Sequence, residues 1–195
     1  LLGHFLRKPS PFMVLDTHAG IGRYDLTSEE AEKTQEWKEG IGLLAEEGPN
    51  SPLAPWLDLV KKAGGPRYYP GSPVLTSMML RPQDELICCE KHPDDKRKLY
   101  GLFTRTPNVF VHERDGYEAL RALLPPKTAK RGLVLIDPPY EMKSDYQAVV
   151  AGIHEGYKRF ATGTYALWYP VVLRAQIKRM IKELEATGIR KILQI

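Results

Sequence analysis

Hydrophobic positions along the chain fall into two kinds of segment that alternate. Short apolar runs, continuous rather than interrupted by polar residues, recur at six places and predict strands buried on both faces. These runs are residues 12–16, 85–90, 108–113, 132–137, 164–170 and 190–195. Between most of them apolar residues return every three or four positions, which is the spacing of amphipathic helices. The pattern predicts an α/β fold with a mostly parallel, doubly wound sheet.

Capping residues indicate where several of these helices begin. The N-terminal signals are Asp115 with Glu118, Ser144 with Gln147, and Ser72 followed by Pro73. The last helix is predicted by an apolar stripe at helical spacing, made of Leu173, Ile177, Met180, Ile181 and Leu184. Gly188 follows the stripe and is typical of a helix C-terminus.

One stretch breaks the alternation of strands and helices. Two further helical patterns, at about 28–47 and 55–63, lie between the first strand and Ser72. We interpret residues 27–66 as a small helical insertion after the first strand. The whole chain, 1–195, including this insertion, reads as a single domain.

Composition excludes some classes of protein without identifying the function. The 195 residues are 43% hydrophobic and 27% charged, as in an ordinary globular protein. No apolar run approaches the roughly 20 residues of a membrane-spanning helix. Adjacent Cys88 and Cys89 lie in an apolar run, which favours buried thiols in a reducing, cytoplasmic compartment. The net charge of +4 is compatible with a polyanionic partner but does not demonstrate one.

A glycine turn follows the first strand, in the segment "DTHAGIGRY". Asp16 ends the strand, and Gly20 and Gly22 allow the backbone to approach a ligand closely. A dinucleotide fingerprint is not met, because Asp25 stands where the third glycine belongs. An aspartate before a short glycine turn suits S-adenosylmethionine better. Taken alone, the turn fits a purely structural role equally well.

Acidic residues also end or follow the next two strands. Glu90 can accept the two ribose hydroxyls of a nucleoside, although it can also be a simple exposed acid. Asp115 can accept the adenine amino group and Gly116 can leave room for the base, while Asp115 is also a plain helix N-cap. Acids at three successive strand ends favour a nucleoside site, because parallel strands end at the same edge of a sheet.

The fourth strand runs into "DPPY", and this sequence suits the methylation of an amine. Asp137 can accept one N–H of an exocyclic adenine amine, and the carbonyl oxygen of Pro138 can accept the other. Tyr140 offers a face on which an extruded base can stack. Lys143, next to this turn, is a candidate for contacting a phosphate of the nucleic acid that carries such a base. The alternative is a rigid turn that merely closes a strand.

The motifs together resemble one known family. "LDTHAGIGRYDL", "RYYPGSP", "DPPYEMKSDYQAVV" and "EGYKRFATGTYALWYPV" are similar to the bacterial 23S ribosomal RNA adenine-N6 methyltransferase J family over essentially the whole chain. The resemblance implies a Rossmann-like class I methyltransferase that uses S-adenosylmethionine to methylate N6 of one adenosine in 23S rRNA. It also implies that parts of both family termini are lacking here.

Carried over to matching positions, the resemblance implies a set of cofactor contacts. These are His18, Ser72, Glu90, Asp115, Gly116 and Asp137, with Asp137 catalytic as well. Spacing alone does not select His18 or Ser72. We expect 23S rRNA as the partner, a monomer, no metal and no membrane association. The alternatives are a DNA adenine-N6 methyltransferase and a non-catalytic RNA-binding assembly factor.

Overall fold

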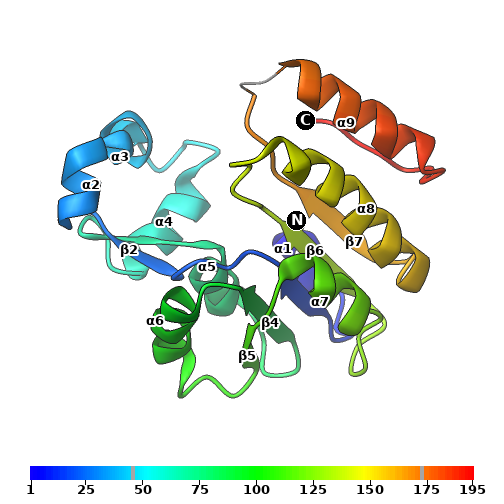
Figure 1. The fold of residues 1–195 in the computed structure, drawn as a ribbon. Coiled ribbons are helices and arrows are strands. Elements are labelled where there is room, and N and C mark those ends of the chain that lie inside the picture. The colour runs from blue at the N-terminus through cyan, green and yellow to red at the C-terminus, as the bar shows by residue number, and fades with distance from the viewer. Residues whose placement is uncertain (45–46, 172–173) are drawn as a thin grey trace.

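The computed structural model describes residues 1–44, 47–171 and 174–195. These residues form a five-stranded parallel sheet in the order β5-β4-β1-β6-β7 (Figure 1). The strands are β1 (Met13–Asp16), β4 (Glu85–Glu90), β5 (Val109–Glu113), β6 (Gly132–Ile136) and β7 (Thr164–Leu167). The next two strands along the chain, β4 and β5, lie on one side of β1, and the last two, β6 and β7, lie on the other. The strand order therefore reverses at β1. The predicted α/β fold is confirmed.

Helices cover both faces of this sheet. The helices that connect or flank the strands are α1 (Leu2–Leu6), α5 (Ser72–Met79), α6 (Pro93–Phe103), α7 (Gly116–Ala122), α8 (Lys143–Arg159) and α9 (Arg174–Ala186). Met13 and Leu15 of β1 pack with α7, α8 and α9, whereas Val14 packs with α1 and α6. Each fully buried aliphatic side chain of this kind contributes about 1.5–3 kcal/mol. Continuous apolar strands are therefore what the sheet requires.

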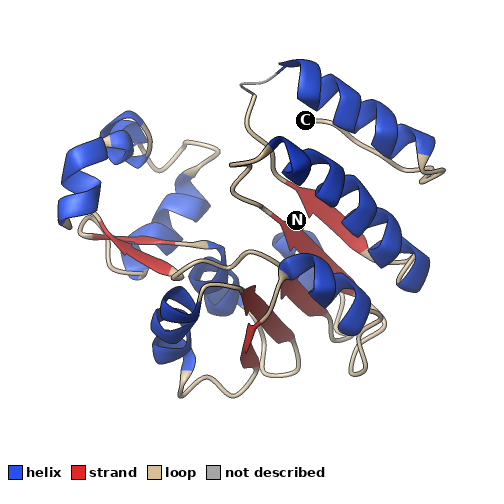
Figure 2. Cartoon of the chain, in the orientation of Figure 1, coloured by secondary structure: helices blue, strands red, loops and turns tan. Residues whose placement is uncertain are grey.

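The insertion forms a lobe beside the sheet (Figure 2). It contains α2 (Glu29–Thr34), α3 (Glu36–Glu39), a 3₁₀ turn η1 (Ile41–Leu44) and α4 (Ala54–Lys62). The single helix expected over 28–47 is therefore wrong. Gln35 ends α2 in the left-handed conformation, with φ of 53°, and Gly40 ends α3. These two residues break the pattern into short pieces.

Two short strands, absent from the sequence predictions, connect this lobe to the main sheet. β2 (Arg23–Asp25) and β3 (Tyr68–Pro70) pair antiparallel, with Tyr24 opposite Tyr69. We call this pair the ribbon. The Gly71 N–H donates to the Gly22 carbonyl oxygen at 2.8 Å, which joins the end of the ribbon to the glycine turn.

Three further expectations need correction, the last strand and the starts of helices α8 and α5. Residues 190–195 form no strand, because no described strand pairs with their backbone; instead the Gln194 side chain donates to the Tyr169 hydroxyl at 2.7 Å. Helix α8 begins before Ser144, because Asp145 accepts the Met142 N–H at 3.0 Å.

Likewise, Gly71 is the N-cap of α5, so Ser72 is its first residue. Asp115 is the N-cap of α7, as predicted. Leu173, part of the predicted apolar stripe, lies outside the described residues, while Ile177, Met180 and Leu184 are buried in α9. Within the described ranges, no helix is both long and apolar enough to span a membrane.

Candidate active site

The carboxyl ends of the central strands meet at a cavity of about 300 Å³. Its lining comes from the glycine turn, the ribbon, the start of α5 and the end of β6. The lining residues are His18, Ala19, Tyr24, Tyr69, Pro70, Gly71, Ser72, Leu75 and Asp137. The structure therefore brings His18, Ser72 and Asp137, which are far apart in the sequence, to one cavity.

Asp16, at the end of β1, is the most unusual group near this cavity. Only 1% of it is exposed, and neither carboxylate oxygen has a hydrogen-bond partner among the described residues. Burial raises its pKa to about 6, and nearby Asp137 and Glu90 raise it further. The Ser72 hydroxyl and the His18 N–H lie near enough to lower the pKa in part. A buried carboxylate without a partner calls for a cationic or hydrogen-bonding ligand.

Glu90 holds the glycine turn in place. Its Oε2 accepts the Gly20 N–H at 2.9 Å, and its Oε1 accepts the His92 N–H at 2.8 Å. Gly20 has φ of +60°, and a Cβ there would lie 2.5 Å from the Tyr24 hydroxyl. The positive φ is the reason that the turn favours glycine, since the Tyr24 hydroxyl lies at the end of a side chain that can shift. Each oxygen of Glu90 keeps a lone pair that can accept a ligand hydroxyl.

His18 and the start of α7 form one wall of the site. The His18 Nδ1 lies 2.8 Å from the Thr17 hydroxyl, and its ring meets the Tyr117 ring edge-on at 5.3 Å. Burial lowers the pKa of His18, and the Asp115 carboxylate opposes this effect. Gly116 lies against the Thr17 carbonyl so closely that a Cβ would clash with it. In this structure Gly116 permits close packing of two loops.

Asp115 already has partners for both carboxylate oxygens. Its Oδ1 accepts the Tyr117 N–H at 2.9 Å and the Glu118 N–H at 3.3 Å, which caps α7. Its Oδ2 lies 3.2 Å from the Lys91 ammonium, whose side chain is 78% exposed. Burial raises its pKa, but Lys91 and the two N–H groups outweigh this and lower it overall. The carboxylate is ionised, and its pair with the exposed Lys91 leaves Oδ2 accessible to another partner.

The Asp-Pro-Pro-Tyr turn follows β6 directly. Asp137 is exposed at the cavity, yet the surrounding protein still desolvates it enough to raise its pKa. Pro138 is buried, and the proline that follows it restricts its backbone to the extended region. Tyr140 has φ of 52°, an uncommon conformation for a residue other than glycine. Its hydroxyl donates to the Trp168 carbonyl oxygen at 2.9 Å, and its ring lies 4.8 Å from the Tyr146 ring.

Exposed side chains surround this turn. Lys143 is exposed at the first position of α8 and makes no ion pair within the described residues. Trp168 is 56% exposed and Met142 is 66% exposed. No three His, Cys, Asp or Glu side chains in the described part of the chain are arranged to hold a metal ion. The surface beside Asp137 therefore offers aromatic, apolar and cationic groups.

Comparison with known proteins establishes the family. The family model described as "Ribosomal RNA large subunit methyltransferase D, RlmJ" matches residues 9–195. This chain belongs to that family. "Ribosomal RNA large subunit methyltransferase J" of Escherichia coli K12 is 57% identical over 96% of this chain and 68% of its own length. The protein of the same name from Haemophilus influenzae Rd is 52% identical over 100% of this chain and 71% of its own length.

A solved structure agrees with the RlmJ assignment. A Legionella pneumophila protein of family DUF519 has a TM-score of 0.88 and 36% identity, covering 96% of this chain and 70% of that one. The family resemblance found in the motifs is thereby confirmed, as is the fold class. Membership in a family of large-subunit rRNA methyltransferases makes this chain a methyltransferase.

Six residues that line the cavity were not among the predicted site residues of this RlmJ-family chain: Ala19, Tyr24, Tyr69, Pro70, Gly71 and Leu75. Tyr24 and Tyr69 come from the ribbon, and Gly71 follows it. Tyr24 lies over Gly20, and burial together with Asp16 raises its pKa. The segment "RYYPGSP" contributed to the resemblance, but nothing in its local pattern places it beside the glycine turn.

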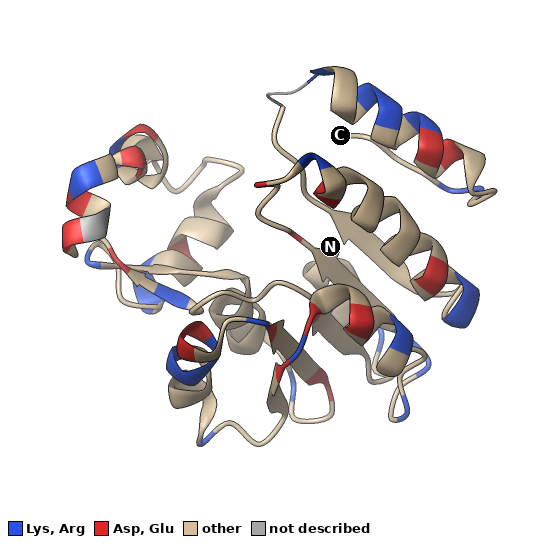
Figure 3. Cartoon of the chain, viewed as in Figure 1, with Lys and Arg blue, Asp and Glu red and all other residues tan. Residues whose placement is uncertain are grey.

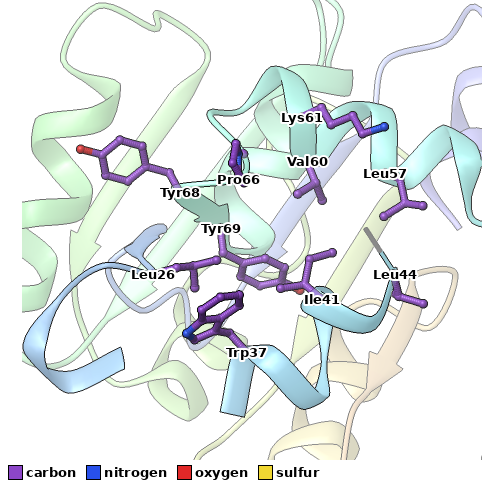
Figure 4. A pocket seen from close by; sticks show the side chains of 12 residues that line it. Leu26, Trp37, Ile41, Leu44, Leu57, Val60, Lys61, Pro66, Tyr68 and Tyr69 are labelled. Atoms are coloured by element: carbon purple, nitrogen blue, oxygen red, sulfur yellow. The ribbon is translucent and has the colours of Figure 1, made fainter. Parts of the chain in front are cut away.

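A larger cavity, about 410 Å³, lies between the insertion and the ribbon, whose Tyr68 and Tyr69 line it (Figure 4). Its lining is almost entirely apolar and aromatic, including Trp37, Leu57 and Val60, and its named lining holds no carboxylate, histidine or cysteine. Tyr69 lines this cavity as well as the smaller one, so it separates the two. Catalytic chemistry needs convergent polar groups, which only the smaller cavity offers.

Proposed function

We propose that this chain transfers a methyl group from S-adenosylmethionine to N6 of an adenosine in 23S ribosomal RNA. One observation carries the proposal. The Asp-Pro-Pro-Tyr turn borders the same cavity beside which Asp16 is buried without a partner. An amine acceptor and an unsatisfied anion are thus found at one strand edge, within a family of large-subunit rRNA methyltransferases.

The residues present fit the cofactor. The Asp16 carboxylate, buried and without a partner, suits the ammonium group of the methionine moiety. Ser72 and the N-terminal N–H groups of α5, together with His18, suit the methionine carboxylate. Glu90 is available for ribose hydroxyls, and Asp115, with Gly116 beside it, for the adenine amino group. When bound, S-adenosylmethionine supplies an electrophilic methyl group on a sulfonium.

The chain's own groups prepare the amine. Asp137 accepts one N–H of the target adenine, and the Pro138 carbonyl oxygen accepts the other. Two fixed acceptors localise the amine lone pair in the direction of the electrophile. Asp137 is also placed to accept the proton that the amine loses. Because Tyr140 is held by Trp168 and Tyr146, its ring offers the target base a fixed face.

The test is methyl transfer with purified protein and radiolabelled S-adenosylmethionine on an unmodified 23S rRNA transcript. We expect N6-methyladenosine in the digested nucleosides. Replacing Asp137 with Ala is expected to lower kcat by about 10³-fold, with a smaller loss of cofactor affinity measured by calorimetry. Glu185→Ala, which removes an exposed carboxylate of α9, is the control and should leave kcat unchanged.

The outcomes separate this proposal from its alternatives. Equal labelling of unmethylated duplex DNA and of the transcript would favour a DNA methyltransferase. RNA binding without any transfer would favour an assembly factor. Full activity of Asp137→Ala would overturn the assigned role of this residue. The proposal includes the cytoplasm as the place of the activity and a monomer as the active form.

A further inference from the structure

The two faces of the ribbon carry different chemistry. Side chains alternate along a strand, and cross-strand pairs share a face. Tyr24 and Tyr69 are such a pair, and both line the cavity at the active site. Arg23 and Tyr68 lie on the outer face, where the Arg23 guanidinium packs on the Tyr68 ring. Tyr68 also borders the larger cavity beside the insertion, and Figure 4 shows its ring directed away from the ring of Tyr69.

Two arginines pack on Tyr68 at this outer face. The guanidinium carbon of Arg23 lies 4.6 Å from the centre of the Tyr68 ring, and that of Arg67 lies 4.9 Å from it. Arg67 is also held by Asp25, with Nη2 to Oδ2 at 2.8 Å and Nε to Oδ2 at 3.1 Å. We call Arg23, Arg67 and Tyr68 the arginine–tyrosine cluster. Its geometry is fixed by the ribbon before any ligand binds.

The cluster has a cation that is free to bind a ligand. Arg67 is neutralised by Asp25, whereas Arg23 is exposed and forms no ion pair with any described residue. The lobe as a whole bears both signs of charge, and the ribbon carries basic positions (Figure 3). A planar guanidinium already stacked on an aromatic ring can bind a phosphate with its N–H groups and can stack on a nucleobase.

The position of the cluster indicates which nucleotide it would meet. Arg23 is next to Tyr24, whose hydroxyl lies over Gly20 in the glycine turn, and the ribbon forms a wall of the cavity that the target base must enter. Extruding a base from a stack leaves its neighbour unstacked. The nucleotide next to the target adenosine would then lie close to the ribbon.

We infer that the arginine–tyrosine cluster is an RNA-binding site for the unpaired nucleotide next to the methylated adenosine. This inference rests on the proposed function. Arg23 binds the phosphate and presents its guanidinium plane to the base, while Tyr68 and Arg67 hold that plane in place. A partner with these properties is a single-stranded segment of RNA.

The test measures RNA binding without turnover, in the Asp137→Ala background. The ligand is the labelled 23S rRNA transcript, titrated at several salt concentrations by filter binding. Adding Arg23→Ala is expected to raise Kd about tenfold and to reduce the slope of log Kd against log salt by about one. Arg23→Lys should keep the salt slope but recover only part of the affinity, because an ammonium has no planar face.

Arg121→Ala is the matched control, since Arg121 is an exposed arginine near the C-terminal end of α7, away from the ribbon. It should change Kd by less than about twofold. An unchanged Kd for Arg23→Ala, an equal loss for Arg121→Ala, or full recovery by Arg23→Lys would overturn the inference. So would a matching loss of thermal stability or of S-adenosylmethionine affinity in Arg23→Ala, because that would make the cluster structural.

The same experiment separates this inference from the proposed function. Absence of methyl transfer by the wild-type protein counts against the proposed function, whatever Arg23→Ala does. Methyl transfer by the wild type together with undiminished RNA binding by Arg23→Ala counts against the cluster alone.

Discussion

Two buried aspartates lie at opposite edges of the same sheet and have opposite environments. Asp84, just before β4 at the amino edge, accepts bonds from the Phe12 N–H, the Arg81 N–H and the Arg81 guanidinium. Asp16, at the carboxyl end of β1, has no hydrogen-bond partner among the described residues. Both are at most 1% exposed. The satisfied carboxylate holds neighbouring segments of the fold together, and we propose that the unsatisfied one serves a ligand.

Electrostatics follow the same division. Burial raises the pKa of Asp84, but the bonds from Arg81 and from the Phe12 N–H outweigh it, so the pKa is lowered. At Asp16 the nearby Ser72 hydroxyl and His18 N–H offset only part of the effect of burial, and the pKa rises to about 6. One edge therefore gains stability from its ionised aspartate, and the other loses stability when its aspartate ionises.

The largest expected effect is at the amino edge. Replacing Asp84 with Ala leaves Arg81 and two N–H groups without their acceptor, and it should lower the free energy of unfolding by about 3 kcal/mol. This figure allows for the partial exposure of Arg81, whose side chain is 25% exposed. Chemical denaturation measures it, and a loss no greater than that of the control would contradict the comparison. Asp58→Ala, which breaks an exposed pair with Lys62, is that control and should cost less than about 0.5 kcal/mol.

The opposite sign is expected at the carboxyl edge. Replacing Asp16 with Asn removes a charge that is unfavourable in the folded, ligand-free protein, and it should raise the free energy of unfolding above pH 7 by up to about 3 kcal/mol. The same change should sharply weaken the binding of S-adenosylmethionine, measured by calorimetry. A variant that is both less stable and unchanged in cofactor affinity would show that Asp16 serves the fold.

The pH dependence follows from the raised pKa. The folded protein holds the Asp16 proton up to about pH 6, whereas the unfolded chain releases it near the ordinary value of 3.8. The favourable contribution is thus complete below pH 3.8 and is lost as the pH rises through about 6. The stability difference between Asp16→Asn and wild type should grow over this interval and then level off. A constant difference across it would mean that Asp16 is not the titrating group.

The two edges also differ in how far the sequence predicts them. The strand at 85–90 has the predicted bounds, and β1 differs from 12–16 by one residue, because strands buried on both faces are continuous apolar runs. The carboxyl ends of such strands meet at one edge, so Asp16 and Asp137 could be placed near each other from the sequence. The sequence placed the starts of α5 and α8 one or two residues too late, at Ser72 and Ser144, because a polar residue that can cap a helix can also lie in its first turn.

What escaped prediction depends on contacts between distant segments. β2 and β3 are only three residues each, too short to show a period, and they exist because Tyr24 pairs with Tyr69. The apolar run 190–195 has the composition of a strand but no described partner. His18 and Ser72 were expected only from the family resemblance, because neither spacing nor residue type distinguishes them from ordinary loop and capping residues.

The smallest expected effect compares two tyrosine hydroxyls. The Tyr140 hydroxyl donates to the Trp168 carbonyl oxygen, just after the carboxyl end of β7. The Tyr165 hydroxyl donates to the Phe160 carbonyl oxygen, just before the amino end of β7. Changing either tyrosine to Phe removes one neutral hydrogen bond, so each variant should lose about 1 kcal/mol of stability. Only Tyr140→Phe should also lower kcat, by a few fold. Without its hydroxyl anchor, a residue with φ of 52° is less firmly held, and its ring positions the target base less well.

Thermal unfolding and single-turnover methylation of the transcript measure both effects. The affinity for RNA should stay unchanged in Tyr140→Phe, because the aromatic face remains. If Tyr165→Phe lowers kcat as much as Tyr140→Phe, the loss comes from general loosening of β7. If neither lowers kcat, the bond to Trp168 contributes to stability alone, and the carboxyl edge then owes its function to its carboxylates and to the Pro138 carbonyl.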